Sequence, residues 1–271
     1  MVEVPVARQA TYSPLLGLSA PNAGWTPPLR YLLRRARILR LATRIARGRL
    51  LEVGCGAGAL LADFSRMGFA AEGLETSPSA LAMSQRLAAL DAAGPRVMAV
   101  PGQDWNDTFD VLCTFDVLEH VEHDSEALAQ WIGWVRPGGA VLISVPAHPS
   151  RWSAGDEWAG HWRRYSRPML LDLLRSSRLQ VEHLECYGFP LANLTEMAGA
   201  RSYRRMIDQR EDLSRDEATA HSGTDRRAYS KLSRAIASPL GRLALRGAMA
   251  MQAATCHTDW GSGYLVLARK Q

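Results

Sequence analysis

Three glycines at alternate positions form the most informative chemical pattern in the chain. Residues 50–58 read LLEVGCGAG: apolar residues around one acid predict a short buried strand, and Gly54, Gly56 and Gly58 predict a tight turn. Residues 59–64 then have helical character. A ligand at this turn would meet backbone N–H groups at a helix N-terminus, beside the carboxyl end of a strand. The pattern therefore predicts a nucleotide-type site.

A second group of reactive side chains lies at the end of a predicted strand, residues 109–116. The stretch 114–124 reads TFDVLEHVEHD and contains Asp116, Glu119 and His120. A histidine with an ordinary pKa of about 6.5 can remove a proton from a phenol or alcohol, so His120 is a candidate general base. The acid-x-x-acid-His spacing also offers ligands for Mg²⁺, Mn²⁺ or Zn²⁺. A third interpretation is that this stretch merely opens a helix.

Residues 145–167 concentrate aromatic and titratable side chains, with three Trp, two His and one Tyr. The stretch is too polar and too rich in proline to predict a helix. Loops of this composition over a strand end usually serve a function, so His148, His161 and Tyr165 are candidate substrate-side residues. The alternative is an exposed loop whose arginines pair with its own acids.

Alternating strands and helices must position these groups, and they indicate an α/β sheet. Glu75 ends the second strand, where a carboxylate can accept hydrogen bonds from both hydroxyls of a ribose. Asp104 and Trp105 close the third strand. Strands are predicted at 50–53, 69–74, 97–100, 109–116, 140–145, 179–186 and 263–269.

Taken together, these segments resemble class I S-adenosylmethionine (SAM)-dependent methyltransferases, in particular the broad group that includes ubiquinone-type O-methyltransferases. The resemblance covers residues 48–187 and includes the Pro-Gly-Gly turn at 137–139. It implies a Rossmann-like seven-stranded sheet, with SAM as cofactor and S-adenosylhomocysteine as product. A nicotinamide cofactor, which the loose Gly54-x-Gly56-x-x-Ala59 fingerprint also permits, is disfavoured because that turn and Asp104-Trp105 would have no role.

The resemblance also implies roles for individual residues on the cofactor side. Glu52 would support the loop or face the SAM ammonium, Glu75 would bind the ribose, and Asp104 would accept from the adenine amino group. Trp105 would either pack on the adenine ring or simply fill the core. The predicted cofactor residues are Glu52, Gly54, Cys55, Gly56, Gly58, Glu75, Thr76, Asp104, Trp105, Thr114, Phe115 and Asp116.

On the substrate side, the His-x-Arg-Arg-Tyr-Ser element at 161–166 resembles one that closes the active site in bacterial relatives. The predicted catalytic residues are His120, His148, His161 and Tyr165. Asp116, Glu119 and His120 resemble the metal-binding stretch of small-RNA 2′-O-methyltransferases and some ubiquinone O-methyltransferases, which His148 or His161 could complete. Asp116 replaces the usual Glu and shortens the reach. We predict no metal, and name these residues as the ligands if one is used.

Bulk composition sets wider limits. The chain has 271 residues, 47% hydrophobic, enough for one sizeable core. Its net charge of +5 comes from 30 Arg and 2 Lys against 27 acids, a bias that argues only weakly for a polyanionic partner. The four cysteines are far apart and are expected to be reduced thiols. No signal-peptide or membrane-spanning stretch is recognised, so we expect a cytoplasmic protein.

Four segments are predicted: an N-terminal helical lid at 1–48, a SAM-binding Rossmann-like core at 49–187, a helical cap insertion with a mobile, charged centre at 188–258, and the last strand at 259–271. Residues 1–24 should be extended or irregular. The arginine-rich helix from Pro27 either grips an acidic substrate or RNA, or is a lid with a solvated arginine face.

The predicted function is methyl transfer to a small molecule, as O-methylation of a metabolite or natural product in secondary metabolism. The alternatives are a metal-assisted RNA 2′-O-methyltransferase and a SAM-binding protein that catalyses another reaction. A small-molecule substrate is expected, nucleic acid is disfavoured, and the protein is expected to be a monomer or homodimer.

Overall fold

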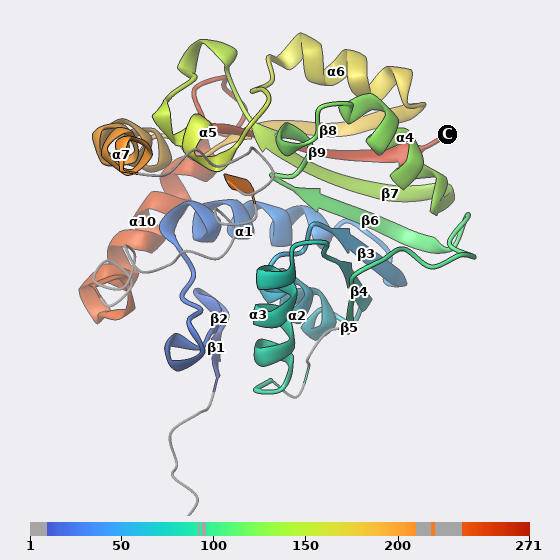
Figure 1. Ribbon diagram of the computed structural model, residues 1–271, viewed down its shortest axis with the longest axis horizontal. Coiled ribbons are helices and arrows are strands. Elements are labelled where there is room, and N and C mark those ends of the chain that lie inside the picture. The colour runs from blue at the N-terminus through green and yellow to red at the C-terminus, as the bar shows by residue number, and fades with distance from the viewer. Residues whose placement is uncertain (1–9, 92, 94–95, 210–217, 220–234) are drawn as a thin grey trace, which may run out of the picture.

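A seven-stranded sheet forms the centre of the protein, as the computed structural model shows (Figure 1). The structure describes residues 10–91, 93, 96–209, 218–219 and 235–271. The strand order is β5-β4-β3-β6-β7-β9-β8. Of these strands, β9 alone runs in the direction opposite to the rest of the sheet. This confirms the predicted Rossmann-like sheet. The strands are β3 (Arg49–Val53), β4 (Ala70–Leu74), β5 (Arg96–Met98), β6 (Phe109–Phe115), β7 (Val135–Pro146), β8 (Leu179–Tyr187) and β9 (Gly263–Lys270).

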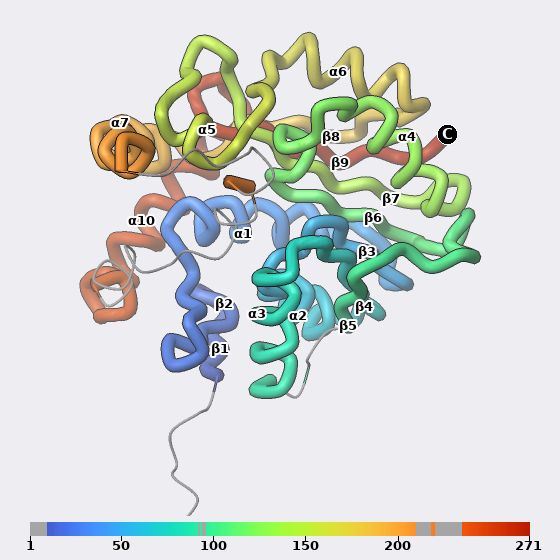
Figure 2. Tube along the Cα trace, in the orientation of Figure 1, coloured from blue at the N-terminus to red at the C-terminus, as the bar shows by residue number. Residues whose placement is uncertain are grey.

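Helices cover both faces of this sheet (Figure 2). On one face lie α1 (Leu29–Ala42), α2 (Ala59–Arg66) and α3 (Pro78–Ala88), and on the other α4 (Asp124–Gly133) and α6 (Arg167–Ser176). Successive strand residues point to opposite faces, so Leu50 packs toward α1 and α2 while Leu51 packs toward α4 and α6. Continuous apolar strands are what a sheet buried on both faces requires.

Three further helices gather at one end of the sheet (Figure 1). They are α5 (Ala154–Ala159), α7 (Leu191–Asp208) and α10 (Pro239–Thr255), and this is the end where β6 and β7 finish. The insertion before the last strand is therefore helical, as predicted. Most of its charged centre lies outside the described residues, and the boundaries of the lid and the cap remain predictions. No helix in the described part of the chain is both long enough and apolar enough to cross a membrane.

Two local predictions were wrong. Residues 145–167 do contain a helix, α5, because Ser153 and Asp156 form a reciprocal capping box and Gly160 ends the helix with φ at 76°. The third strand ends at Met98, before the predicted Val100. The predicted irregular segment at 1–24 is described only from residue 10, and there β1 (Thr11–Ser13) and β2 (Gly17–Ser19) pair as an antiparallel hairpin.

The arginines of α1 match neither predicted interpretation, because the inner ones pair with carboxylates inside the protein. Arg34 pairs with Asp116. Arg37 binds Glu185 through two bonds of 2.7 Å. The charges of these side chains are therefore matched inside the protein, and they form no surface for RNA.

Arg35 makes the most deeply buried of these pairs. Its guanidinium donates two hydrogen bonds of 2.6 Å to Asp63 on α2, and the two side chains are only 2% and 1% exposed. The hydroxyl of Tyr12 donates to the same carboxylate at 2.9 Å. One ion pair thus fastens α1, α2 and the N-terminal hairpin together.

Asp63→Ala is expected to lower the free energy of unfolding by about 3 to 5 kcal/mol, because it leaves the Arg35 charge buried without a partner. Urea denaturation measures this. The matched control is Asp172→Ala, which removes the partner of Arg175 in a pair that is 77% and 70% exposed, and should cost less than about 1 kcal/mol. Equal losses in the two variants would contradict the assigned importance of the buried pair.

Candidate functional site

The glycine loop between β3 and α2 has the predicted tight geometry. Gly54, Gly56 and Gly58 all have positive φ, at 67°, 56° and 71°. A side chain at Gly54 would collide with Val117, while the Gly54 N–H donates to the carbonyl of Leu74 at 2.8 Å. The loop is therefore packed against the ends of β4 and β6, and only glycine suits its backbone.

Glu75 braces this loop from the end of β4. One carboxylate oxygen accepts from the N–H of Gly56 and the other from the N–H of Ser77, both at 2.8 Å. A carboxylate has about four acceptor positions, so Glu75 can still accept bonds from ligand hydroxyls. Thr76, beside it, is exposed.

Several polar atoms near the loop are buried without a hydrogen-bond partner. They include Oε2 of Glu52, Oγ1 of Thr114, the hydroxyl of Tyr31 and Nε of Arg34. Burial raises the pKa of Glu52 to about 8, although the charge of Arg34 opposes the shift. Because buried polar atoms normally have partners, unpaired donors and acceptors in one region mark a place for a polar ligand.

Asp116 lies at the carboxyl end of β6, with an unusual positive φ of 55°. It pairs with Arg34 and accepts a hydrogen bond of 2.9 Å from the hydroxyl of Ser144. Burial would raise its pKa, but Arg34 and Arg30 outweigh that effect and lower it. Asp116 is therefore an ionised carboxylate held by α1.

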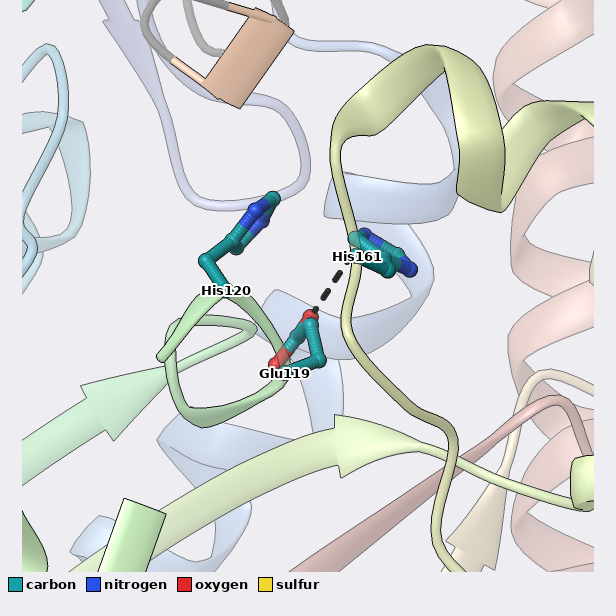
Figure 3. Close-up of side chains that lie close together, drawn as sticks. All are labelled: Glu119, His120 and His161. Carbon is teal, nitrogen blue, oxygen red and sulfur yellow. Dashed lines mark ion pairs between the residues drawn. The ribbon is translucent and has the colours of Figure 1, made fainter. Parts of the chain in front are cut away.

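Glu119, His120 and His161 lie together beyond β6, with ligand atoms within 4.8 Å of one another (Figure 3). Nε2 of His161 is 4.0 Å from Oε1 of Glu119, and the rings of His120 and His161 meet edge to face at 4.7 Å. Burial and the charge of Asp116 raise the pKa of Glu119 well above its ordinary value. Of the predicted metal set, Glu119 and His120 meet His161, one of the two histidines expected to complete it, whereas Asp116 is paired with Arg34.

His161 is oriented by Asp156, a residue for which the sequence suggested only ion pairing. Nδ1 of His161 is 2.9 Å from Oδ1 of Asp156, which also accepts from Arg164 at 2.7 Å. Burial would raise the pKa of Asp156, but these two hydrogen bonds lower it, so it is an ionised acceptor. The Nδ1 atom must then carry hydrogen, which leaves Nε2 with a lone pair when the imidazole is neutral. The Asp-x₄-His spacing across a capping box is the signal that could have identified this pair.

His120 is a weak base in this group. Burial, aided by the nearby His161, lowers the pKa of His120 to about 3. Its Nδ1 atom lies 3.1 Å from Oγ1 of Thr219. A group that holds a proton so weakly is a poor general base at neutral pH.

Two predicted catalytic residues are not part of this group. Tyr165 is 1% exposed, and its hydroxyl donates to Asp124 at 2.7 Å. It therefore ties the segment after α5 to the start of α4. His148 instead lies beside Cys186 and Tyr264.

The two residues predicted to hold adenine, Asp104 and Trp105, have different surroundings. Trp105 packs edge to face against Phe109 and Trp134 at 5.3 and 5.1 Å, which corresponds to the core-filling role that the sequence left open. Asp104 is exposed. Cys55 and Phe115 are buried, at 8% and 5% exposed.

Comparison with known proteins gives matches to one family. A family model described as a methyltransferase domain matches residues 29–191. The mitochondrial ubiquinone biosynthesis O-methyltransferase of Schizosaccharomyces pombe is 32% identical over 102 residues, which cover 36% of this chain and 37% of that protein. The corresponding enzyme of Nitrobacter winogradskyi is 32% identical over 127 residues, which cover 44% and 49%. The chain thus spans less than half the length of either relative.

Solved structures share the fold at low sequence identity. A SAM-dependent methyltransferase from Mesorhizobium loti has a TM-score of 0.52 and 17% identity, over 87% of this chain and 98% of that one. The [4+2]-cyclase SpnF has a TM-score of 0.52 and 18% identity, over 98% of this chain and 87% of that one. Proteins with different reactions therefore share this architecture.

Glu52→Gln is expected to stabilise the protein at alkaline pH. The folded pKa of about 8 lies above the ordinary 4.5, so the carboxyl's stabilising contribution is complete below pH 4.5 and is lost as pH rises toward 8. The neutral amide does not titrate. The stability difference between variant and wild type should therefore grow across this window, by at most about 3 to 5 kcal/mol.

Urea denaturation at several pH values across that window measures the difference. Glu122→Gln, which changes an exposed carboxylate, is the control and should show little change with pH. A difference for Glu52→Gln that is the same at both ends of the window would contradict a raised pKa.

Proposed function

This chain belongs to a family of methyltransferase domains, and on that basis we propose that it transfers a methyl group from SAM to an oxygen atom of a small metabolite or natural product. The observation that supports this best is the set of unpaired, buried polar atoms beside the glycine loop. The cytoplasm as location, and a monomer or homodimer as the working form, belong to the same proposal.

The polar atoms around the loop fit the amino-acid end of SAM. Glu52 is an acceptor suited to the ammonium, and Tyr31 and Arg34 are donors suited to the carboxylate. Glu75 would accept from the ribose hydroxyls while it braces Gly56. The remaining cofactor-side residues, Cys55, Gly58, Thr76, Thr114, Phe115 and Asp116, would line the same end of the sheet.

SAM supplies a methyl group that its sulfonium has already activated for transfer. The protein must then align the acceptor, exclude water and remove a proton from the hydroxyl. His161 suits the last role, because Asp156 fixes its tautomer and would stabilise the imidazolium that forms. The histidine and carboxylate together form a base that is oriented before the acceptor arrives.

Three alternatives to this proposal are compared with it. An RNA substrate loses its main support, since Arg34, Arg35 and Arg37 pair inside the protein. The group formed by Glu119, His120 and His161 keeps a metal-assisted transfer as the second candidate. A reaction other than methyl transfer is compatible with the fold, because fold does not determine reaction.

Incubation of the protein with SAM and a panel of phenolic, carboxylate, amine and RNA acceptors tests the proposed function. We expect a small oxygen acceptor to gain one methyl group, with an equal amount of S-adenosylhomocysteine, as measured by mass spectrometry. Methylation of RNA and of no small molecule would favour the second candidate, metal-assisted transfer, with RNA as its substrate. SAM binding without S-adenosylhomocysteine from any acceptor would reject methyl transfer.

His161→Gln is expected to lower kcat by about 10²- to 10⁴-fold because it removes the base, with little change in the Kd for SAM. Initial rates and calorimetry measure the two quantities. His123→Gln, which changes an exposed histidine outside the group around His161, is the control. Loss of wild-type activity with EDTA, restored by Mg²⁺ or Mn²⁺, would instead make His161 a metal ligand, and equal loss of kcat and SAM affinity would make it a scaffold residue.

A further inference from the structure

A second cluster of potential ligand atoms lies apart from the proposed base. Nε2 of His148 is 3.9 Å from Sγ of Cys186, and a carboxylate oxygen of Asp259 lies within 4.8 Å of both. His148 lies two residues after β7, Cys186 lies near the end of β8, and Asp259 precedes β9. Neither the glycine loop nor the group around His161 includes these residues.

The backbone holds His148 in an unusual conformation that places its ring in this cluster. Its φ is 63°, in a region where non-glycine residues are uncommon. Its N–H donates to the carbonyl of Tyr165 at 2.8 Å, which fixes the residue against the segment after α5. Backbone strain of this kind persists only where the surrounding structure enforces it, and it concentrates at functional sites.

The loop that contains Asp259 is pressed against the end of β8. The N–H of Cys186 donates to the carbonyl of Cys256 at 2.9 Å, and the N–H of Ser262 donates to the carbonyl of Tyr187 at 2.8 Å. A side chain at Gly261 would collide with the backbone of Cys186 and Tyr187. The three ligand-bearing segments are therefore fixed relative to one another before any ligand binds.

Neighbouring groups orient the side chains in the way that metal sites require. The hydroxyl of Tyr264 donates to Oδ1 of Asp259 at 2.8 Å and leaves the other oxygen available. The backbone of Gly261 lies within hydrogen-bonding reach of both the His148 ring and the Cys186 sulfur. Outer hydrogen bonds to imidazole, carboxylate and thiolate are typical of bound metals.

We propose that His148, Cys186 and Asp259 bind one divalent transition-metal ion, for which Zn²⁺ is the best match. Thiolate, imidazole and carboxylate are its usual ligands, and three protein ligands leave one tetrahedral position for water. Ligand atoms in such a site are about 3.3 to 3.8 Å apart, so the 3.9 Å separation between His148 and Cys186 needs little adjustment.

Charge balance is compatible with this ion. On binding, the Cys186 thiol loses its proton to solvent and forms the metal–sulfur bond, and the Asp259 carboxylate supplies the second negative charge. Arg151 carries a positive charge that would repel the metal ion, but its guanidinium donates to the carbonyls of Gly261 and Trp260. It thereby holds the loop in place at some cost in electrostatic repulsion.

Co²⁺ titration of the full-length protein, first stripped of metal with a chelator, tests this site. We expect one equivalent to produce the near-ultraviolet charge-transfer absorption of a thiolate–Co²⁺ bond, and Zn²⁺ to displace it. Glu119, His120 and His161 contain no thiol, so Co²⁺ bound there would give no such band.

Cys186→Ser should abolish the band, and Asp259→Asn should weaken Co²⁺ binding by at least about tenfold. Cys256→Ser, which changes the half-buried cysteine beside Arg37, is the matched control and should keep the band. Asp259 is exposed, so its variant decides the question even if Cys186→Ser fails to fold. No band in the wild type, a band that survives Cys186→Ser, or unchanged affinity in Asp259→Asn would overturn the proposal, whatever the outcome for methyl transfer.

Discussion

The need to pair buried charge is the constraint on which the rest of this structure depends. Three arginines of α1, at positions 34, 35 and 37, bind carboxylates on β6, α2 and β8 respectively. Arg35 is buried and the other two are largely shielded from water, so removal of a partner would leave a poorly compensated guanidinium. One helix is thereby fixed to three separate parts of the chain, and the end of the sheet where ligands would bind is fixed with it.

Neighbouring cations and burial together determine which acids are ionised. Asp116 lies next to Arg34 and has a lowered pKa, and Asp156 is kept ionised by Arg164 and His161. Burial instead dominates at Glu52 and Glu119, whose pKa values are raised. Carboxylates of similar chemistry a few residues apart thus have opposite protonation states. This division gives the site both fixed negative charges and neutral acids, which a polar ligand or a metal ion could ionise.

Features with local causes could be predicted from the sequence. The glycine loop, the strand that ends at Glu75 and the seven-stranded sheet follow from turn chemistry and apolar patterning, which act over a few residues. Long-range contacts could not be predicted in the same way. That His161 meets Glu119 while His148 meets Cys186 depends on how the segment after β7 folds over the sheet, and its capping box at Ser153 was missed. The partners of Arg35 and Arg37 are 28 and 148 residues away in sequence, so the amphipathic pattern alone indicated either a face that binds an acidic partner or a solvated face.

The pairing of β8 with β9 has a consequence for how this chain could diversify. The two strands are hydrogen-bonded up to Tyr187 and Gly263, so the segment 188–262 starts and ends at neighbouring points of a rigid sheet. The entropy cost of closing a loop between fixed ends grows only logarithmically, by about 0.6 kcal/mol for each doubling of length. Evolution can therefore lengthen, shorten or exchange the helices carried on this segment at little cost to the core, while the strands beneath it stay unchanged.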